Sequence, residues 1–480
     1  MERRDIYLNI SPLDQRYWAA NSELFDSLAK YLSESAAVRY MVKAELALLR
    51  VYINEYLDKR AELLAAVNEL EDSIHPESVE KEERLTNHNV RALVNVIQRK
   101  LPDELKPWVH MGATSADVTE TSTAIRIRDA MRRVVIPLLL DLLDACIRIT
   151  EEEADTPQAG RTHGQWAVPI TFGFAIAEYV SRLGQSLVEI EKRSRGLRGK
   201  LSGAVGAYNA TSLISLEPER LEAAYLRELG LKSPDYSNQL VEPEHLLRLL
   251  LELNTAFGII ANLADDLRHL QRSEIGELSE GFDVGQVGSS TMPQKRNPWN
   301  CEHVKSLWKA FSPRALTFYL DQISEHQRDL TNSASGRFIA DYIAGFAAAA
   351  ARMHGILEKL VIRRDRMAEN LRGIGDGILA EPCYILLAVS GISDAHEKIR
   401  EATLSADSSK RSLRDVLRED EPDLWETLSS ALELRLGGSA RDFFDSPEKY
   451  RGLASLKAKR IAKRYAEVSA RIRSMVNGTA

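Results

Sequence analysis

Cysteine is scarce in this sequence: 480 residues contain only three, Cys146, Cys301 and Cys383. Their odd number and wide spacing argue against a disulfide framework. Neither a Cys-x-x-Cys pair nor a Cys/His cluster suggests a zinc site. We therefore expect neither disulfides nor a structural metal.

Turn-forming residues are also few. Glycine and proline number 26 and 16, which is about 9 % of the chain against an average near 12 %. A β-sandwich or a barrel needs a turn roughly every ten residues. The composition therefore disfavours both architectures and favours long helices.

Long apolar runs and an excess of one charge are absent as well. No stretch reaches the ~18 apolar residues of a membrane span, and the N-terminus lacks the apolar segment of a signal peptide. Lys and Arg sum to 63 and Asp and Glu to 70, for a net charge of −7, so there is no basic footprint for nucleic acid. The sequence predicts a cytosolic, cytoplasmic protein whose partners include neither a membrane nor nucleic acid.

The chain is rich in helical periodicity. Across residues 243–273, apolar side chains step alternately by four and three, as at Leu246, Leu250 and Leu253. This is the pattern of a long helix in a bundle. Four further segments have similar patterns: 122–153, 170–196, 299–323 and 338–363. In the first of them, Pro137 predicts a kink.

These patterns predict an all-α protein built around a central bundle of long helices. Changes in pattern near residues 111 and 364 divide the chain into three units: an N-terminal helical unit at 1–111, the bundle at 112–364 and a small C-terminal helical unit at 365–480. Several bundle helices are apolar on more than one face, as at Leu249, Leu250 and Leu251. One chain can hardly cover all of these faces, so we expect an oligomer with a shared helical core.

A 23-residue segment at 276–298, GELSEGFDVGQVGSSTMPQKRNP, lies between two helical patterns. Loops longer than about 12–15 residues inside a domain are usually functional or disordered. Its last residues are dense in polar groups, among them Ser289, Lys295 and Asn297. One interpretation is a lid that closes over a substrate and delivers these groups; a plain connection is the other, and spacing alone does not decide.

Two shorter clusters contain residues suited to acid–base work or anion binding. GRTHGQ at 160–165 contains His163, just before a helix expected near Pro169, although a single histidine more often lies on the surface or in the core. HMGATSADVTET at 110–121 places Thr114 and Ser115 before a helix. Ser115 is either a plain N-cap or part of a carboxylate or phosphate site formed by free helix amides, and the two can hold together.

A third cluster, HQRDLTNSASGR at 326–337, contains Arg328, Ser333 and Arg337. Two guanidinium groups and a hydroxyl could form an anion clamp, because arginine binds phosphate through paired hydrogen bonds. An ordinary surface salt bridge is the commoner use of arginine, and the sequence leaves both interpretations open.

The segment GSSTMPQKRNP at 288–298 resembles the signature of the fumarase/aspartase superfamily. Further segments, in matching order and at similar separations, resemble the adenylosuccinate lyase family: SPLDQRY at 11–17, NHNV at 87–90, HMGATS at 110–115, GRTHGQ at 160–165, GKLSGAVGAYNA at 199–210, NQ at 238–239 and RDLTNSASGR at 328–337. The resemblance covers nearly the whole chain and is weakest in the last hundred residues.

The resemblance implies an all-α homotetramer with a central bundle from four subunits and active sites each shared among three of them. It implies β-elimination of fumarate from an N-substituted succinate, with Ser289 as general base, His163 as general acid and no metal or organic cofactor. The residues that it implies for binding a small-molecule nucleotide substrate are Arg16, Tyr17, His88, Asn89, Thr114, Ser115, Thr162, Gln239, Lys295, Asn297, Arg328, Ser333 and Arg337.

Two positions depart from the family pattern. Asn89 stands where the family usually has aspartate, and Gln294 stands where it often has histidine or tyrosine. Both leave the reaction class intact and keep open a sister lyase that acts on another N-substituted aspartate, as argininosuccinate lyase does. A non-catalytic structural homologue is the third alternative, against which the retention of Ser289 and His163 argues.

Overall fold

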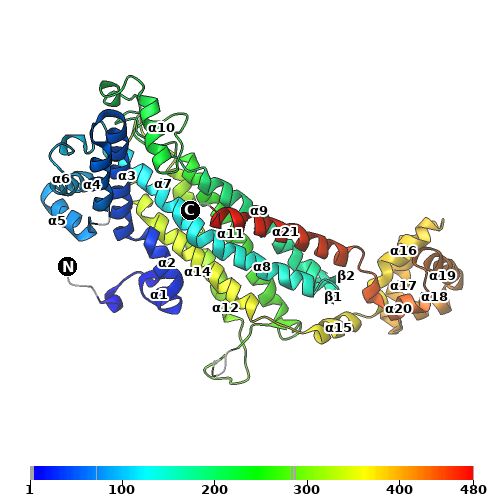
Figure 1. Cartoon of the computed structure of the whole chain (residues 1–480). Coiled ribbons are helices and arrows are strands. Elements are labelled where there is room, and N and C mark those ends of the chain that lie inside the picture. The colour runs from blue at the N-terminus through cyan, green and yellow to red at the C-terminus, as the bar shows by residue number, and fades with distance from the viewer. Residues whose placement is uncertain (1–4, 72, 283–284, 286–287, 479–480) are drawn as a thin grey trace.

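The structure is a computed structural model that describes residues 5–71, 73–282, 285 and 288–478. Long helices run side by side along one axis, with shorter helices gathered at each end (Figure 1). The helices at the N-terminal end are α1 (Arg16–Ala20), α2 (Ser22–Leu32), α3 (Glu34–Tyr56), α4 (Arg60–Glu71), α5 (Pro76–Thr86) and α6 (Asn89–Lys100). Helices α3 to α6 enclose a core of their own, which includes Leu46, Leu93 and Ile97.

The central bundle contains the main hydrophobic core. Its helices, with α10 beside them, are α7 (Ser115–Ala130), α8 (Ile136–Glu152), α9 (Phe172–Arg195), α10 (Pro218–Glu228), α11 (Glu244–Leu270), α12 (Trp299–Phe311), α13 (Arg314–Leu320) and α14 (Ile339–Glu358). The segment predicted at 299–323 is broken at Pro313, which separates α12 from α13.

Helices α7 and α8 are joined by a single π-helical turn at Met131–Val135. Pro137 is the second residue of α8 and has no N–H to donate to the preceding turn. The irregularity predicted at Pro137 thus takes the form of a π-turn just before it. As a result, α7 and α8 lie nearly in line along the bundle (Figure 1).

Helix α11 is long and apolar enough, by length and composition, to cross a membrane. However, 56 % of its most apolar stretch is buried inside the chain, because α9, α12 and α14 pack around it. Such a helix is weak evidence for a membrane span. Leu249 and Leu250 are buried within the single chain, whereas Leu251 is half-buried, so one chain covers part of the apolar surface of this helix.

Apolar side chains are exposed instead on and after α13. Leu316, Tyr319, Leu320 and Ile323 are each more than half exposed, Ile323 by 71 %. Large apolar side chains gathered on one short segment are typical of a surface that contacts another chain.

The C-terminal helices are α15 (Arg364–Gly373), α16 (Ala380–Val389), α17 (Ala395–Ser409), α18 (Leu413–Asp420), α19 (Pro422–Leu436), α20 (Ala440–Asp445) and α21 (Ala454–Asn477). Helices α16 to α20 share a separate core. Helix α21 lies elsewhere: it runs back along α8 and α9 (Figure 1). Tyr465 packs where Gly184 leaves room on α9, and Arg473 binds Asp141 and Asp144 of α8 at 2.9 and 2.7 Å. Within the predicted 365–480 unit, α21 therefore packs on the bundle, whereas α16 to α20 pack on one another.

Among the described residues, two small antiparallel ribbons interrupt the helices. One pairs β1 (Pro157–Thr162) with β2 (Gln165–Thr171), and the other pairs β3 (Leu278–Ser279) with β4 (Val361–Ile362). Each stands beside a segment that carries predicted site residues.

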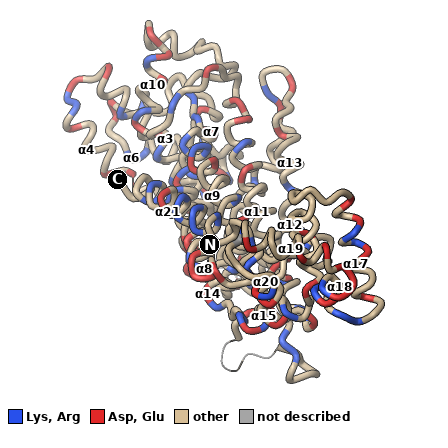
Figure 2. The backbone as a smooth tube through the Cα atoms, turned by 90° about the vertical axis from the view of Figure 1, so that its right-hand side faces the viewer, with Lys and Arg blue, Asp and Glu red and all other residues tan. Residues whose placement is uncertain are grey.

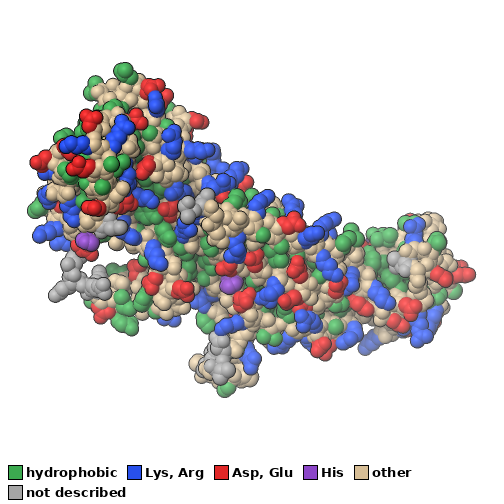
Figure 3. Space-filling view, viewed as in Figure 1, with side chains coloured by type: hydrophobic (Ala, Val, Ile, Leu, Met, Phe, Trp, Pro, Cys, Tyr) green, Lys and Arg blue, Asp and Glu red, His purple; other side chains and the backbone are tan. Residues whose placement is uncertain are grey.

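Acidic and basic residues are intermixed along the chain (Figure 2). On the face shown in Figure 3 they also alternate with apolar patches. The net charge of −7 is therefore spread over the surface rather than gathered on one side.

Candidate active site

The signature segment forms a compact turn around Ser289. The hydroxyl oxygen of Ser289 accepts the backbone N–H of Met292 at 3.1 Å. Lys295 donates its backbone N–H to the Met292 carbonyl at 3.0 Å, and the Asn297 amide donates to the Gly288 carbonyl at 3.1 Å. The side chain of Lys295 is exposed, and Ser289 is half-exposed. The turn thus presents a hydroxyl and an ammonium group outward on a closed backbone.

Glycine is required at position 288. A Cβ there would lie 2.3 Å from the Lys295 carbonyl oxygen, so any other residue would force the two ends of the turn apart. The glycine of the signature is therefore explained by close backbone packing.

The first residues of segment 276–298, which was interpreted as either a lid or a plain connection, are packed into the structure. Glu277, Ser279 and Glu280 are buried, and β3 pairs with β4. The Glu280 carboxylate also accepts the backbone N–H of Cys301 at 2.7 Å, at the start of α12. Glu280 thus joins the start of this segment to α12, and residues 277–280 belong to the packed core.

His163 lies at the tip of the β1–β2 ribbon rather than before a helix. His163 and Gly164 both have positive φ, 54° and 74°, as the two-residue turn of a hairpin requires. The side chains of Thr162 and His163 are exposed. Helix α9 begins only after β2, so the helix expected near Pro169 is displaced by the second strand.

Thr114, not Ser115, is the N-cap residue of α7. Asp117 accepts the Thr114 backbone N–H at 2.8 Å and forms an ion pair with Lys200; both side chains of the pair are at most 1 % exposed. Asp117 also accepts the Ser202 N–H at 3.2 Å. This buried network ties the segment 110–115 to the glycine-rich segment 199–210.

A cavity of about 700 Å³ opens beside these segments and brings four predicted residues together: Asn89, Arg328, Ser333 and Arg337. Gln239 lies next to it, because its backbone N–H binds the Gln327 carbonyl at 3.3 Å. Cavities of this size suit a small molecule. His88 does not line it; its ring nitrogen caps α6 by accepting the Arg91 N–H at 3.2 Å.

Several charged residues that line the same cavity were not predicted, and two of them belong to α7. Glu120 and Arg126 project from α7 into it. Burial raises the pKa of Glu120, against the charges of Arg328 and Lys200, and burial lowers the pKa of Arg126. Helical spacing could have found Arg126, which follows Ser115 by about three turns of α7; Glu120 lies off that face of the helix and gives no such signal.

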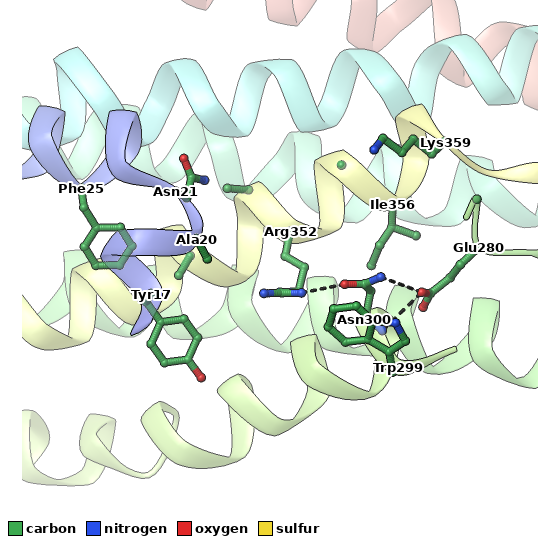
Figure 4. Close-up of a pocket in the computed structure, with 14 residues that line it drawn as sticks. Tyr17, Ala20, Asn21, Phe25, Glu280, Trp299, Asn300, Arg352, Ile356 and Lys359 are labelled. Atoms are coloured by element: carbon green, nitrogen blue, oxygen red, sulfur yellow. Dashed lines mark hydrogen bonds between the residues drawn. The ribbon is translucent and has the colours of Figure 1, made fainter. Parts of the chain in front are cut away.

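Arg16 and Tyr17 lie in a different place. Tyr17 lines a second pocket of about 420 Å³ with Arg352 and Asn300. Figure 4 shows Arg352 pointing to Asn300, which in turn binds Glu280. The Tyr17 hydroxyl is hydrogen-bonded to His303 at 2.9 Å.

Burial, together with the positive charges of Arg352 and Arg16, lowers the pKa of His303. A lower pKa favours the neutral imidazole, which can share a hydrogen bond with the Tyr17 hydroxyl. This pocket also adjoins the root of the signature loop through Glu280.

One chain therefore distributes the predicted residues over separate places. Ser115 begins α7 and His163 follows the end of α8; residues 115–152, at 1.5 Å per residue, span about 55 Å. Figure 1 shows these two helices in line, with the β1–β2 ribbon at the far end. No small substrate can touch both residues in a single chain.

Metal ligands do not gather in the described part of the chain, where no group of three or more His, Cys, Asp or Glu residues could hold an ion. The cavity is lined by the guanidinium groups of Arg328 and Arg337 and also by carboxylates, among them Glu120 and Asp321. The two guanidinium groups are suited to binding an anion.

A long-helix bundle that carries this signature turn defines a lyase of the fumarase/aspartase type. Residues 12–309 match the lyase family model, and residues 324–435 match the model of the adenylosuccinate lyase C-terminal domain. The chain belongs to the adenylosuccinate lyase family.

Individual relatives agree with this membership. The chain is 32 % identical to an adenylosuccinate lyase of Archaeoglobus fulgidus, over 86 % of this chain and 90 % of that protein. It is also 32 % identical to one of Aquifex aeolicus, over 72 % and 78 %. Among solved structures, a fumarate lyase from Mesorhizobium sp. BNC1 shares the fold, with a TM-score of 0.77 at 22 % identity over 91 % of this chain and 97 % of that one.

Proposed function

We propose that this chain catalyses the β-elimination of fumarate from adenylosuccinate, giving AMP, and from succinylaminoimidazole carboxamide ribotide. The observation that carries the proposal is the cavity in which Arg328, Ser333 and Arg337 meet. Two guanidinium groups and a hydroxyl suit a nucleotide phosphate. Membership of the family supports the elimination reaction, and the arginine residues of the cavity support a phosphorylated substrate.

The reaction needs a base, an acid and a site for negative charge. Ser289 removes the carbon-bound proton next to a carboxylate, and His163 protonates the leaving nitrogen, a contribution of about 10²–10⁴ in rate. The aci-carboxylate that forms is stabilised by donors placed in advance. Lys295, Asn297, Thr114 and Ser115 are the donors that we assign to the succinyl carboxylates.

The remaining binding groups hold the nucleotide and the region of the scissile bond: Arg16, Tyr17, His88, Asn89, Thr162 and Gln239. We propose no metal or organic cofactor, because the elimination is redox-neutral and the substrate carboxylate takes up the electron pair. The proposed location is the cytosol.

A single chain cannot complete this site, since about 55 Å separate Ser115 from the region of His163. We therefore propose a homotetramer in which each active site takes residues from more than one subunit. The exposed apolar side chains on and after α13, Leu316 and Ile323 among them, support such an assembly.

A sister activity on another N-substituted aspartate is the second candidate. The observation that favours it is Asn89, which lines the cavity where the family usually has a carboxylate. With asparagine at position 89 the cavity lacks the negative charge of that carboxylate, and this changes the electrostatic environment of the leaving group.

A direct assay tests both candidates. Purified protein is mixed with adenylosuccinate, and the loss of its succinylamino-purine absorbance is followed; argininosuccinate is assayed in parallel. We expect turnover of adenylosuccinate. The absence of turnover at micromolar enzyme refutes the main proposal, and turnover of argininosuccinate alone would establish the sister activity.

A further inference from the structure

A buried carboxylate, Glu277, lies near the start of segment 276–298, which ends in the signature motif. Its side chain has no exposure and accepts hydrogen bonds from three side chains. Gln158 donates at 2.7 Å, Arg161 donates at 2.6 and 3.3 Å, and Asn370 donates at 2.9 Å. A buried carboxylate is costly unless it is paired in this way, so Glu277 fixes the positions of its donors.

Two of these donors belong to the ribbon that carries His163. Gln158 and Arg161 both lie on β1, and Arg161 is two residues before His163, about 7 Å along an extended strand. In the part of the chain that the structure describes, β1 and β2 pair only with each other. A two-stranded ribbon is marginally stable alone, so its position depends on such anchors.

The ribbon is also irregular next to the anchor. Its register shifts between Ala159 and Arg161, where Gly160 has no room for a Cβ because the Val168 carbonyl oxygen would be 2.4 Å away. A bulge bends a strand and re-aims the side chains beyond it. The direction of the His163 tip is therefore set at Gly160 and held at Arg161.

Glu277 itself is fixed from the opposite side. Its backbone carbonyl accepts the Arg363 N–H at 2.9 Å, and the next residue, Leu278, pairs with Ile362. Asn370 of α15 binds the carboxylate and also the Ile275 carbonyl at 2.9 Å. The Glu277 carboxylate is thus held in a fixed position, and the β1–β2 ribbon is hydrogen-bonded to it.

We propose that Glu277, through Gln158 and Arg161, is a positioning residue that holds the His163 ribbon in place for proton transfer to the leaving group. The inference rests on the proposed role of His163 as general acid. Because Glu277 also stands at the root of the loop that carries Ser289, it fixes the ribbon and the loop root to each other within one chain.

The test uses Glu277→Gln in the full-length protein. The glutamine side chain has nearly the shape of glutamate but no charge. Its NH₂ group would face the N–H groups that donate to the Glu277 carboxylate, with which it cannot form hydrogen bonds. Misplacing a catalytic group by about 1 Å can cost roughly 100-fold in rate, so we expect kcat to fall about 10- to 100-fold with KM changed less than threefold. In a His163→Ala background, Glu277→Gln should lower kcat no further, because it acts through His163.

The matched control is Glu191→Gln. Glu191 is another buried carboxylate bound to an arginine, Arg195, at 3.1 Å on α9, and neither residue lines the described cavities. We expect its kcat to stay within twofold of the wild type. Arg161→Lys keeps one charged donor to Glu277 and should give an intermediate kcat; it carries the test if Glu277→Gln fails to fold.

Hydrogen exchange separates this inference from the proposed function. Amides of residues 158–162 should lose protection in Glu277→Gln and keep it in Glu191→Gln. A further fall of kcat in the His163→Ala background, or unchanged protection of the ribbon, overturns the role of Glu277. If the wild type does not turn over adenylosuccinate, the proposed function fails, and the exchange experiment alone decides whether Glu277 holds the ribbon.

Discussion

The backbone N–H of Met292 points at the hydroxyl oxygen of Ser289, at 3.1 Å. Thr291 offers a second, longer N–H contact at 3.4 Å. Hydrogen bonds donated to an oxygen favour its anionic form. A serine hydroxyl is a poor base at neutral pH, and for the base role that we propose for Ser289 these two amides are the donors that would stabilise an alkoxide.

Replacing Ser289 with alanine should lower kcat/KM for adenylosuccinate by about 10²–10⁴, the range for a lost general base. Ser290→Ala is the control, since Ser290 is exposed next to it and should keep nearly full activity. Rates are measured by the absorbance assay on proteins with matching circular dichroism spectra. Equal losses in the two variants would assign the effect to the turn rather than to the hydroxyl of Ser289.

Arg337→Ala should weaken the binding of the nucleotide phosphate. A hydrogen bond to a charged group contributes about 1.5–3 kcal/mol, so KM should rise about 10- to 100-fold while kcat changes little. Steady-state kinetics with adenylosuccinate and with its phosphate-free nucleoside measure this difference.

The nucleoside provides the control for that experiment. Its KM should be high in the wild type and should not rise further in Arg337→Ala. Arg418→Ala, a surface change in the C-terminal helices, should leave both substrates unaffected. An equal rise in KM for nucleotide and nucleoside would remove Arg337 from the phosphate site.

The buried pair of Lys200 and Asp117 should be needed for stability. Lys200→Met leaves Asp117 as an uncompensated buried charge, which costs about 3–5 kcal/mol. Adding Asp117→Asn removes that charge and should restore part of the loss. Urea denaturation of the single and double variants measures the free energy of unfolding; a double variant that loses the sum of both single effects would contradict the pairing.

The long helices were predictable because apolar residues recur along them for many turns. Helix α9 at Phe172–Arg195 and α11 at Glu244–Leu270 differ from the predicted segments by a few residues. Periodicity could not reveal the ribbon around His163, because His163-Gly164 is not the usual Asn-Gly turn and its strands are short. The path of α21 depends on contacts with Gly184 and Asp144, which are distant in sequence.

The kinds of residue in the candidate site could be predicted from the sequence better than their positions relative to one another. The signature motif and the segment with Arg328, Ser333 and Arg337 could be found as short segments, whereas the cap of α7 was expected at Ser115 and lies at Thr114. Asp117, Lys200 and Glu277 were missed because each acts through partners that only the fold brings near. Nor can a sequence say which of its segments meet within one chain and which meet between chains.

That last question has a direct test, because Ser115 and His163 are separated by the length of α7 and α8. Homogeneous Ser115→Ala and His163→Ala proteins should each have low activity. When they are mixed one to one, unfolded and refolded together, sites that draw the two residues from different subunits become native in about a quarter of cases. Activity should therefore rise to about a quarter of the wild-type value, while each variant refolded alone stays low. A site built within one chain would give no recovery, because every chain in the mixture lacks one of the two side chains.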